Sequence, residues 1–324
     1  MSHPTRRRPS PPLLAALLAA VAVVAQALLI PLFAAPAANL APRDLPIVVA
    51  GPAPGTTELA NRLAAAQPGA FEILVRPDAA AAERALHDRE AYAAFVVGPA
   101  GPVLYTAPAA SPTVASLLVQ GAAELSGGRP PRVVEVVRAD PDDPRGSGFG
   151  AGFLPLGMTS VAVAVLLSLL LPGRVARLAG LLAYGVLAGL GAVAVWQGWL
   201  GVLPGAYLAD AAAVGLFALA TAATVAGLGA LLGRAGIGLG VLVAFLLGNA
   251  LGAVNAAPEL LPQPWGTVGR WLPIGAGADL IRSTAFFDGA AAARPLGLLA
   301  GYAIVGLLLV LVGRAAVIPR HTAR

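Results

Sequence analysis

Long apolar stretches separated by short polar ones dominate the second half of the chain. Between residues 153 and 255 only four residues are charged, and each lies near the end of an apolar run. A helix of about 20 apolar residues crosses the roughly 30 Å hydrocarbon layer of a membrane. The pattern therefore predicts successive membrane-spanning helices. The expected spans are residues 13–35, 153–171, 178–200, 207–232, 235–254 and 296–312.

The first apolar run allows two interpretations. It follows a polar tail, residues 1–12, that carries three consecutive arginines at 6–8. A cleavable signal peptide also begins with basic residues, but its apolar core is usually about 7–15 residues long. The Ala-Pro-Ala tripeptide at 35–37 imitates a cleavage site, whereas the apolar run 13–30 is longer than such a core. The sequence favours an uncleaved anchor over residues 13–35, with cleavage as the alternative.

Residues 36–152 have a different pattern, typical of a small α/β domain. Short β-like runs occur at 45–50, 71–75, 92–97, 102–106 and 132–138. Helical patterns lie between them at about 56–66, 78–89 and 111–125, and alternation of strands with helices predicts an α/β fold. The stretch 139–152 is rich in Gly, Pro and Asp and predicts a linker back to the membrane.

The segment 255–294, between the last two spans, is too polar to cross a membrane. It contains six charged residues and two tryptophans, and several prolines interrupt it. We expect one or two short amphipathic helices that lie at the membrane surface. The predicted fold is thus a polytopic α-helical membrane protein with six spans, in which residues 153–324 form a five-helix domain.

Composition excludes several classes of function. There is no cysteine, so disulfides and thiolate chemistry are absent. All 21 basic residues are arginine, and a P-loop needs a lysine to reach the phosphates. The chain therefore cannot be its own P-loop ATPase. No hydrolase or metalloprotease motif is present, and the three histidines are scattered. We expect no enzymatic activity, cofactor or metal site.

Arginine positions predict the orientation. Six spans with a cytoplasmic N-terminus place nine arginines and no acid on the cytoplasmic side, as the positive-inside rule requires. The C-terminus is then cytoplasmic too, and the α/β domain is extracytoplasmic. Tryptophan prefers the membrane interface. We expect Trp196, Trp199, Trp265 and Trp271 to be anchors at the outer interface.

Few polar residues lie within the spans or at their edges. The candidates for lining a polar path are Asn249, Thr221, Thr224, Gln197 and Asn255, with Asn249 the best candidate, although hydrogen bonds between helices explain most such residues. Arg174, Arg177 and Arg234 are expected to contact a coupled ATPase or lipid phosphates. Glycine pairs four residues apart, such as Gly297 and Gly301, favour close helix packing or a dimer seam.

Two stretches resemble a known family. Residues 264–275 (beginning PW and ending WLPIG), 280–282 (LIR) and 286–289 (FFDG) are similar to the segment before the final helix of type-2 ABC exporter permeases. Residues 92–99 (YAAFVVGP) resemble a strand in the outer domain of the branch that includes the phage infection protein. The sequence IVVAG at 47–51 lacks the Asn and Asp that this branch usually carries.

The resemblance implies an export permease subunit of the bacterial inner membrane. Such a chain forms a homodimer in the lipid bilayer and moves a hydrophobic or amphipathic substrate, driven by a separate ATPase. The alternative is a membrane-anchored extracytoplasmic binding or scaffold protein without transport activity. Neither interpretation involves nucleic acid.

Overall fold

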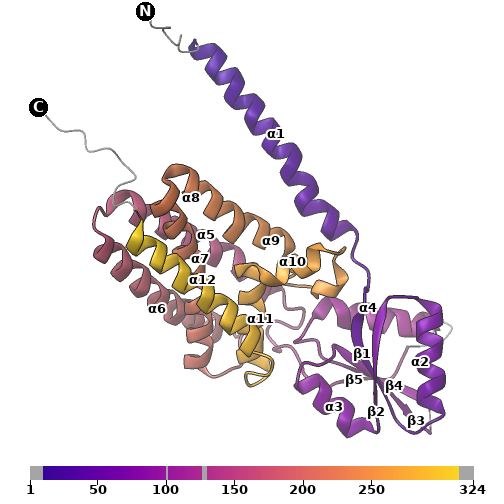
Figure 1. Cartoon of the computed structure of the whole chain (residues 1–324). Helices are drawn as coiled ribbons and strands as arrows, with labels where there is room; N and C mark the ends of the chain where they lie inside the picture. The colour runs from indigo at the N-terminus through magenta and orange to yellow at the C-terminus, as the bar shows by residue number, and fades with distance from the viewer. Residues whose placement is uncertain (1–9, 100, 126–129, 314–324) are drawn as a thin grey trace, which may run out of the picture.

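The computed structural model describes residues 10–99, 101–125 and 130–313, and this part of the chain contains six long apolar helices (Figure 1). Each is long and apolar enough to cross a membrane, which confirms the predicted multi-pass helical class. Six of the nine expected cytoplasmic arginines, at 6–8, 314, 320 and 324, lie outside the described residues. The six helices are α1 (Pro11–Ala38), α5 (Ser147–Leu170), α6 (Arg174–Gly198), α7 (Tyr207–Leu232), the continuous helix α8–η1–α9 (Arg234–Leu251) and α12 (Ala293–Val312).

Five of these helices begin between one and six residues earlier than predicted, and only α7 begins at the expected residue. Helix α1 covers Pro11–Ala38 instead of residues 13–35, because the helix continues through its internal prolines. Helix α5 begins six residues before the expected position, inside the predicted linker. Its first N–H groups need acceptors, and Asp143 supplies one for the N–H of Phe149. The Asp143 carboxylate accepts from the Phe149 N–H at 2.9 Å and from the Ser147 hydroxyl at 3.2 Å.

Helix α7 is the centre of the five-helix bundle. In its most apolar 18-residue window 78% of residues are buried, whereas the corresponding figure for α1 is 0%. Small residues allow the close approach: Gly189 of α6 lies against the backbone of Gly215, and Gly306 of α12 lies against Ala223. Most of helix α1 stands apart from the bundle, and its C-terminal end lies near the end of α9 (Figure 1).

The helices alternate in direction, so their connections lie at two opposite ends of the bundle. The α5–α6 and α7–α8 connections lie at the end away from the α/β domain. The ends of α1, α6 and α9 and the starts of α5, α7 and α12 lie at the other end, which we call the domain end (Figure 1). The structure thus places the α/β domain and the segment 255–292 at the same end of the bundle.

The α/β domain contains a five-stranded sheet in the order β2-β1-β3-β4-β5. Strand β1 pairs in parallel with β2 and β3, β3 pairs antiparallel with β4, and β4 pairs in parallel with β5. Helices α2 and α4 cover one face and α3 the other. Its elements are β1 (Leu45–Ala50), α2 (Gly55–Ala66), β2 (Phe71–Arg76), α3 (Ala79–His87), β3 (Ala93–Gly98), β4 (Gly101–Thr106), α4 (Pro112–Leu125) and β5 (Val133–Glu135).

Alternating side chains of β1 fill both layers of this domain. Ile47 and Val49 belong to the core under α2 and α4, and Val48 belongs to the core under α3, as the period-2 geometry of a strand requires. The membrane half contributes to both cores. Leu260 joins the first core and Phe287 joins the second. The two halves of the chain are therefore packed together at the domain end.

The segment between α9 and α12 differs from the surface helices that its polarity predicts. It contains η2 (Pro258–Leu260), α10 (Trp265–Trp271) and α11 (Pro273–Phe286). Most residues of α11 are buried. A Cβ on its Gly277 would overlap the ring of Phe217, which is ten residues into α7, or about 15 Å along its axis. Helix α11 is thus inserted into the bundle instead of lying on its surface.

Candidate functional site

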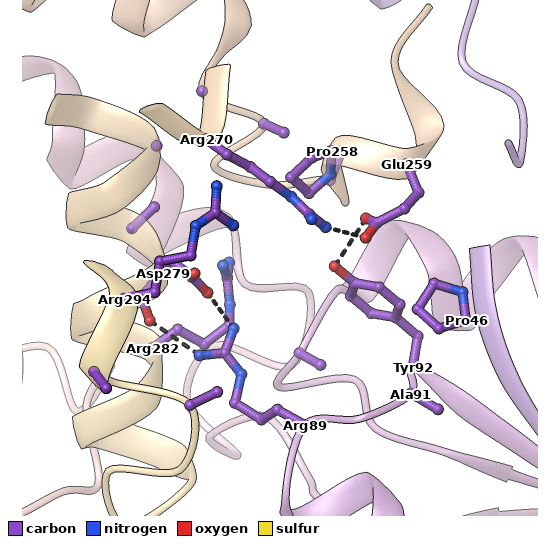
Figure 2. Close-up of a pocket in the computed structure, with 18 residues that line it drawn as sticks. Pro46, Arg89, Ala91, Tyr92, Pro258, Glu259, Arg270, Asp279, Arg282 and Arg294 are labelled. Atoms are coloured by element: carbon purple, nitrogen blue, oxygen red, sulfur yellow. Dashed lines mark hydrogen bonds and ion pairs between the residues drawn. The ribbon is translucent and has the colours of Figure 1, made fainter. Parts of the chain in front are cut away.

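A cavity of about 460 Å³ lies at the junction of the α/β domain and the helix bundle. Its walls come from the start of β1, the α3–β3 connection, η2, α10, α11 and the start of α12 (Figure 2). Small residues line much of it, and every ionisable side chain in its wall other than Tyr92 is an arginine or a carboxylate. These side chains are Arg89, Tyr92, Glu259, Arg270, Asp279, Arg282 and Arg294.

Arg89 connects the α/β domain to α11. Its guanidinium forms an ion pair with the Asp279 carboxylate and donates to the Asp279 backbone oxygen at 3.1 Å. The guanidinium carbon also lies 5.2 Å from the ring centroid of Phe287. Arg89 follows α3 with a φ of 60°, a left-handed conformation that non-glycine residues rarely adopt. This conformation directs the chain past the end of α3, and the side chain reaches the bundle.

Arg270 forms a second ion pair, with Glu259, on the other side of the cavity (Figure 2). Burial lowers the pKa of Arg270, but the charge of Glu259 and the hydrogen bond to it outweigh this effect and raise the pKa. The Tyr92 hydroxyl donates to the same carboxylate at 3.1 Å. Burial, followed by the negative charge of Glu259, raises the pKa of Tyr92. Tyr92 therefore remains a neutral donor at physiological pH.

Arg282 is the most enclosed of the four arginines, with 6% of its surface exposed. Its guanidinium donates to the Val254 carbonyl at 2.7 Å and lies 4.9 Å from the ring centroid of Phe149. Burial, followed by the charge of Arg89, lowers the pKa of Arg282 to about 10. The group still carries its charge at neutral pH. A carbonyl and an aromatic face carry no net charge, so they do not neutralise the buried guanidinium. Arg282 can therefore still attract an anionic ligand.

Arg294 completes the cavity from the first turn of α12. It is exposed, and its guanidinium carbon lies 5.2 Å from the ring centroid of Trp271. Among the described residues neither Arg282 nor Arg294 forms an ion pair. Four arginines and two carboxylates give the lining a net charge of +2. The arrangement can therefore bind an anion, with guanidinium groups that match a phosphate or carboxylate.

The residues expected to line a polar path do not come together at one place. Asn249 and Asn255 line a smaller cavity of about 250 Å³ beside the end of α1. The Gln197 amide donates to the Asp210 carboxylate at 2.8 Å. Thr224 donates to the Ala220 carbonyl of its own helix at 2.7 Å, and Thr221 is buried in the same helix. These three residues line neither cavity.

The arginines at the opposite end of the bundle have different surroundings. Arg174 and Arg234 are exposed. Arg177 is buried, and it donates to the Leu171 carbonyl at 2.6 Å and to the Ser168 carbonyl at 3.1 Å. Carbonyls at the end of a helix lack partners within that helix, so Arg177 closes the end of α5. This contact accounts for Arg177 within the fold, whereas Arg174 and Arg234 face outward.

Three of the four tryptophans are exposed at the domain end, namely Trp199, Trp265 and Trp271. Trp196 differs from the expected interface anchor. Its ring is buried between helices, 6.3 Å from the centroid of Phe149 and 6.1 Å from that of Phe153. A Cβ on Gly152 would overlap this ring. The position of Trp196 is therefore explained by packing within the protein and not by a membrane interface.

The arginine-lined cavity is absent from the sequence prediction. Its charged residues are separated by up to 205 positions, from Arg89 to Arg294, and only the fold brings them together. One signal is present in the sequence, because the segment 255–294 concentrates arginines and acids beside tryptophans. By itself that signal indicates orientation and not a site. No protein-family model, curated protein or solved structure matches the chain.

Proposed function

We propose that this chain is the membrane subunit of a type-2 ABC export system in the bacterial inner membrane. It moves a hydrophobic or amphipathic substrate and is driven by a separate ATPase. The α/β domain is extracytoplasmic, both termini are cytoplasmic, and two copies associate. The resemblance of residues 264–289 to the segment before the final helix of such permeases supports this proposal.

The observation that carries the proposal is the inserted helix α11. With 14 residues it is too short to cross a membrane, for which about 20 are needed. It nevertheless packs against α7 and α12 inside the bundle. Interrupted helices at membrane depth are tolerated where protein or a water-filled cavity surrounds them, and they form the binding sites of many transporters. A bundle that served only as an anchor would not need such an element.

The source of energy follows from what the spans contain. The six spans hold a single carboxylate, Asp210, in the first turn of α7. Its carboxylate accepts a hydrogen bond from the Gln197 amide. Proton-coupled carriers generally use ionisable groups within the membrane as relays. A chain with one carboxylate at the edge of a span, and with no lysine for a P-loop, is better driven by an ATPase from another gene.

The proposed orientation rests on the two ends of the bundle. Arg174, Arg177 and Arg234 lie at the end opposite the α/β domain, where the described chain has no acid. An excess of arginine marks the cytoplasmic side. The isolated helix α1 leaves an apolar surface that a second copy can cover, which supports a homodimer. Exposed Arg174 and Arg234 are the residues best placed to contact the ATPase.

Export can be tested by isolating the complete system. The chain is purified in mild detergent, the co-purifying proteins are identified by mass spectrometry, and any ATPase gene among them is depleted. We expect slower efflux of hydrophobic fluorescent compounds from the depleted cells and from cells that lack the chain. As the control, complementation with the wild-type genes must restore the rate. Absence of an ATPase together with unchanged efflux would contradict the proposal.

One observation favours the alternative, a membrane-anchored binding protein. The turns at 171–173 and 233 are short, so the described chain offers an ATPase little surface at that end. The cavity at the domain junction can hold a ligand without transport. The two functions differ in one measurable respect, since a binding protein retains its ligand when ATP is added to a reconstituted preparation, whereas an exporter with its ATPase moves the ligand across the membrane.

A further inference from the structure

A second hollow lies along the surface of α12, beside the arginine-lined cavity. This groove has a volume of about 570 Å³ and is lined mainly by apolar groups. Arg294 lines both the cavity and the groove. The floor of the groove is fixed by a hydrogen bond from the Tyr302 hydroxyl to the Trp271 carbonyl, 3.0 Å long. The lining residues are Trp271, Arg294, Gly297, Leu298, Gly301, Tyr302 and Val305.

We propose that the cavity and the groove together bind an amphipathic anion. Its phosphate or carboxylate head lies among Arg282, Arg294 and the neighbouring arginines, and a single alkyl chain lies along α12. The proposal concerns binding. As a statement about what is transported, it rests on the function proposed above.

The head group is inferred from the charge of the cavity. Burying a cation is unfavourable unless a partner compensates for the lost water. Arg89 and Arg270 have carboxylate partners, whereas Arg282, which is buried, and Arg294, which is exposed, form no ion pair among the described residues. An anion between these two guanidinium groups would neutralise the excess charge of the lining. Guanidinium groups bind phosphate and carboxylate with paired, charge-assisted hydrogen bonds.

The alkyl chain is inferred from the shape and position of the groove. A Cβ at Gly297 or at Gly301 would meet no atom within 4 Å, so the surface above both glycines is open. From Arg294 to Val305 the helix is about 16 Å long at its usual rise, comparable with an extended dodecyl chain. Because Arg294 stands at the start of the groove, an anionic head and its chain can occupy both hollows at once.

The test uses the full-length chain in nanodiscs of phosphatidylcholine, without any ATPase. Binding of radiolabelled dodecyl phosphate is measured and corrected for empty nanodiscs. Inorganic phosphate and neutral dodecyl maltoside serve as competitors. Arg294→Gln weakens the head contact, and the exposed Arg174→Gln is its matched control at the other end of the bundle. Gly301→Leu fills the groove, and Gly191→Leu, also in open surroundings on α6, is the control.

We expect saturable binding of dodecyl phosphate that Arg294→Gln weakens about tenfold, the effect of one charge-assisted contact. Gly301→Leu should also weaken it, while both control variants bind like wild type. Equal affinity in Arg294→Gln and wild type would overturn the proposal. Competition by inorganic phosphate as strong as that by unlabelled dodecyl phosphate would show a free-phosphate site and contradict the role of the groove.

Native mass spectrometry of the same samples tests whether a second copy of the chain, instead of an alkyl chain, covers the groove. If Gly301→Leu dissociates a dimer and leaves dodecyl phosphate binding unchanged, the glycine face is a contact between copies and the inferred chain site is wrong. Failure of transport is a separate result. Normal binding combined with unchanged efflux in cells would contradict the proposed export function and leave the binding site intact.

Discussion

The two ends of the helix bundle use the same residue type in different ways. At the end away from the α/β domain, Arg174 and Arg234 are exposed and Arg177 bonds to carbonyls of α5. At the domain end, Arg282 is buried against Phe149, and three further arginines surround the same cavity (Figure 2). The first arrangement closes and flanks helix ends. The second concentrates positive charge within an enclosed space.

This difference shows that the number of arginines at an end says little about their role. A lipid-facing arginine needs only a long side chain and a nearby headgroup. A cavity needs walls, and here α11 and the α/β domain provide them. The inserted helix is therefore the element on which the difference between the two ends depends, and perturbing it should have the largest effect.

Gly277→Leu should disrupt the domain end most strongly. Even a Cβ at this position would overlap the ring of Phe217, so a leucine must displace α11 or α7. We expect a loss of about 3 kcal/mol of stability, measured as a lower thermal unfolding midpoint in detergent. Gly238→Leu, in open surroundings on α8 at the other end, is the matched control. Similar midpoints for the two variants would show that α11 is not inserted as described.

Arg282→Ala should have the next largest effect. The substitution leaves the Val254 carbonyl without its donor and removes the side chain over Phe149. We expect a loss of about 2 kcal/mol, again measured from the unfolding midpoint. Arg174→Ala at the other end should leave the midpoint unchanged, because that side chain is exposed. Equal effects of the two substitutions would remove the distinction between the ends.

The ion pair between Arg89 and Asp279 should contribute less. A double-mutant cycle of Arg89→Ala and Asp279→Ala isolates the interaction between them. We expect a coupling of about 1 kcal/mol, near the upper end for partly exposed pairs. The Glu58–Arg62 pair within α2 is more exposed and should give a smaller coupling. Hydrogen exchange at the domain junction should rise in the Asp279 variant, and unchanged exchange would contradict docking through this pair.

The smallest effect concerns the protonation of Tyr92. Its folded pKa is raised above the usual 10.0, so the folded protein holds this proton where the unfolded chain releases it. The stabilisation is present below pH 10 and is lost as pH rises through the folded pKa. Comparison of tyrosinate absorbance in wild type and Tyr92→Phe should show that Tyr92 ionises last. Ionisation of Tyr92 near pH 10 would indicate an open, water-filled contact with Glu259.

Much of the fold could be predicted because local sequence patterns specify it. The length of the apolar runs gives the membrane spans, and the alternation of strand-like and helical segments gives the α/β domain. Most predicted spans agree with the structure within a few residues, and strand β1 has the predicted bounds of 45–50. Helix α11 is predicted to lie at the surface because Asp279 and Arg282 make its sequence polar. The structure compensates both charges through contacts from distant segments, at Arg89 and at Val254. Such compensation cannot be read from a local pattern.

The candidate site could not be predicted for the same reason. Polarity alone selects Gln197 and the other candidates within the spans, and the fold uses Gln197 to bond Asp210. The cavity instead combines a left-handed residue after α3, Arg89, with residues from four later elements, η2, α10, α11 and α12. A tertiary structure is needed to bring these groups together, although the cluster of charge and tryptophan at 255–294 indicates the correct region.

The orientation of the cavity is the most direct test of the whole account. The chain contains no cysteine, so Ala293→Cys at the cavity and Ala176→Cys at the other end can each be labelled singly with a membrane-impermeant maleimide. We predict that intact spheroplasts label Ala293→Cys, and that Ala176→Cys reacts only after the membrane is opened. Labelling of Ala176→Cys in intact spheroplasts, with Ala293→Cys protected, would place the arginine-lined cavity in the cytoplasm and contradict the account.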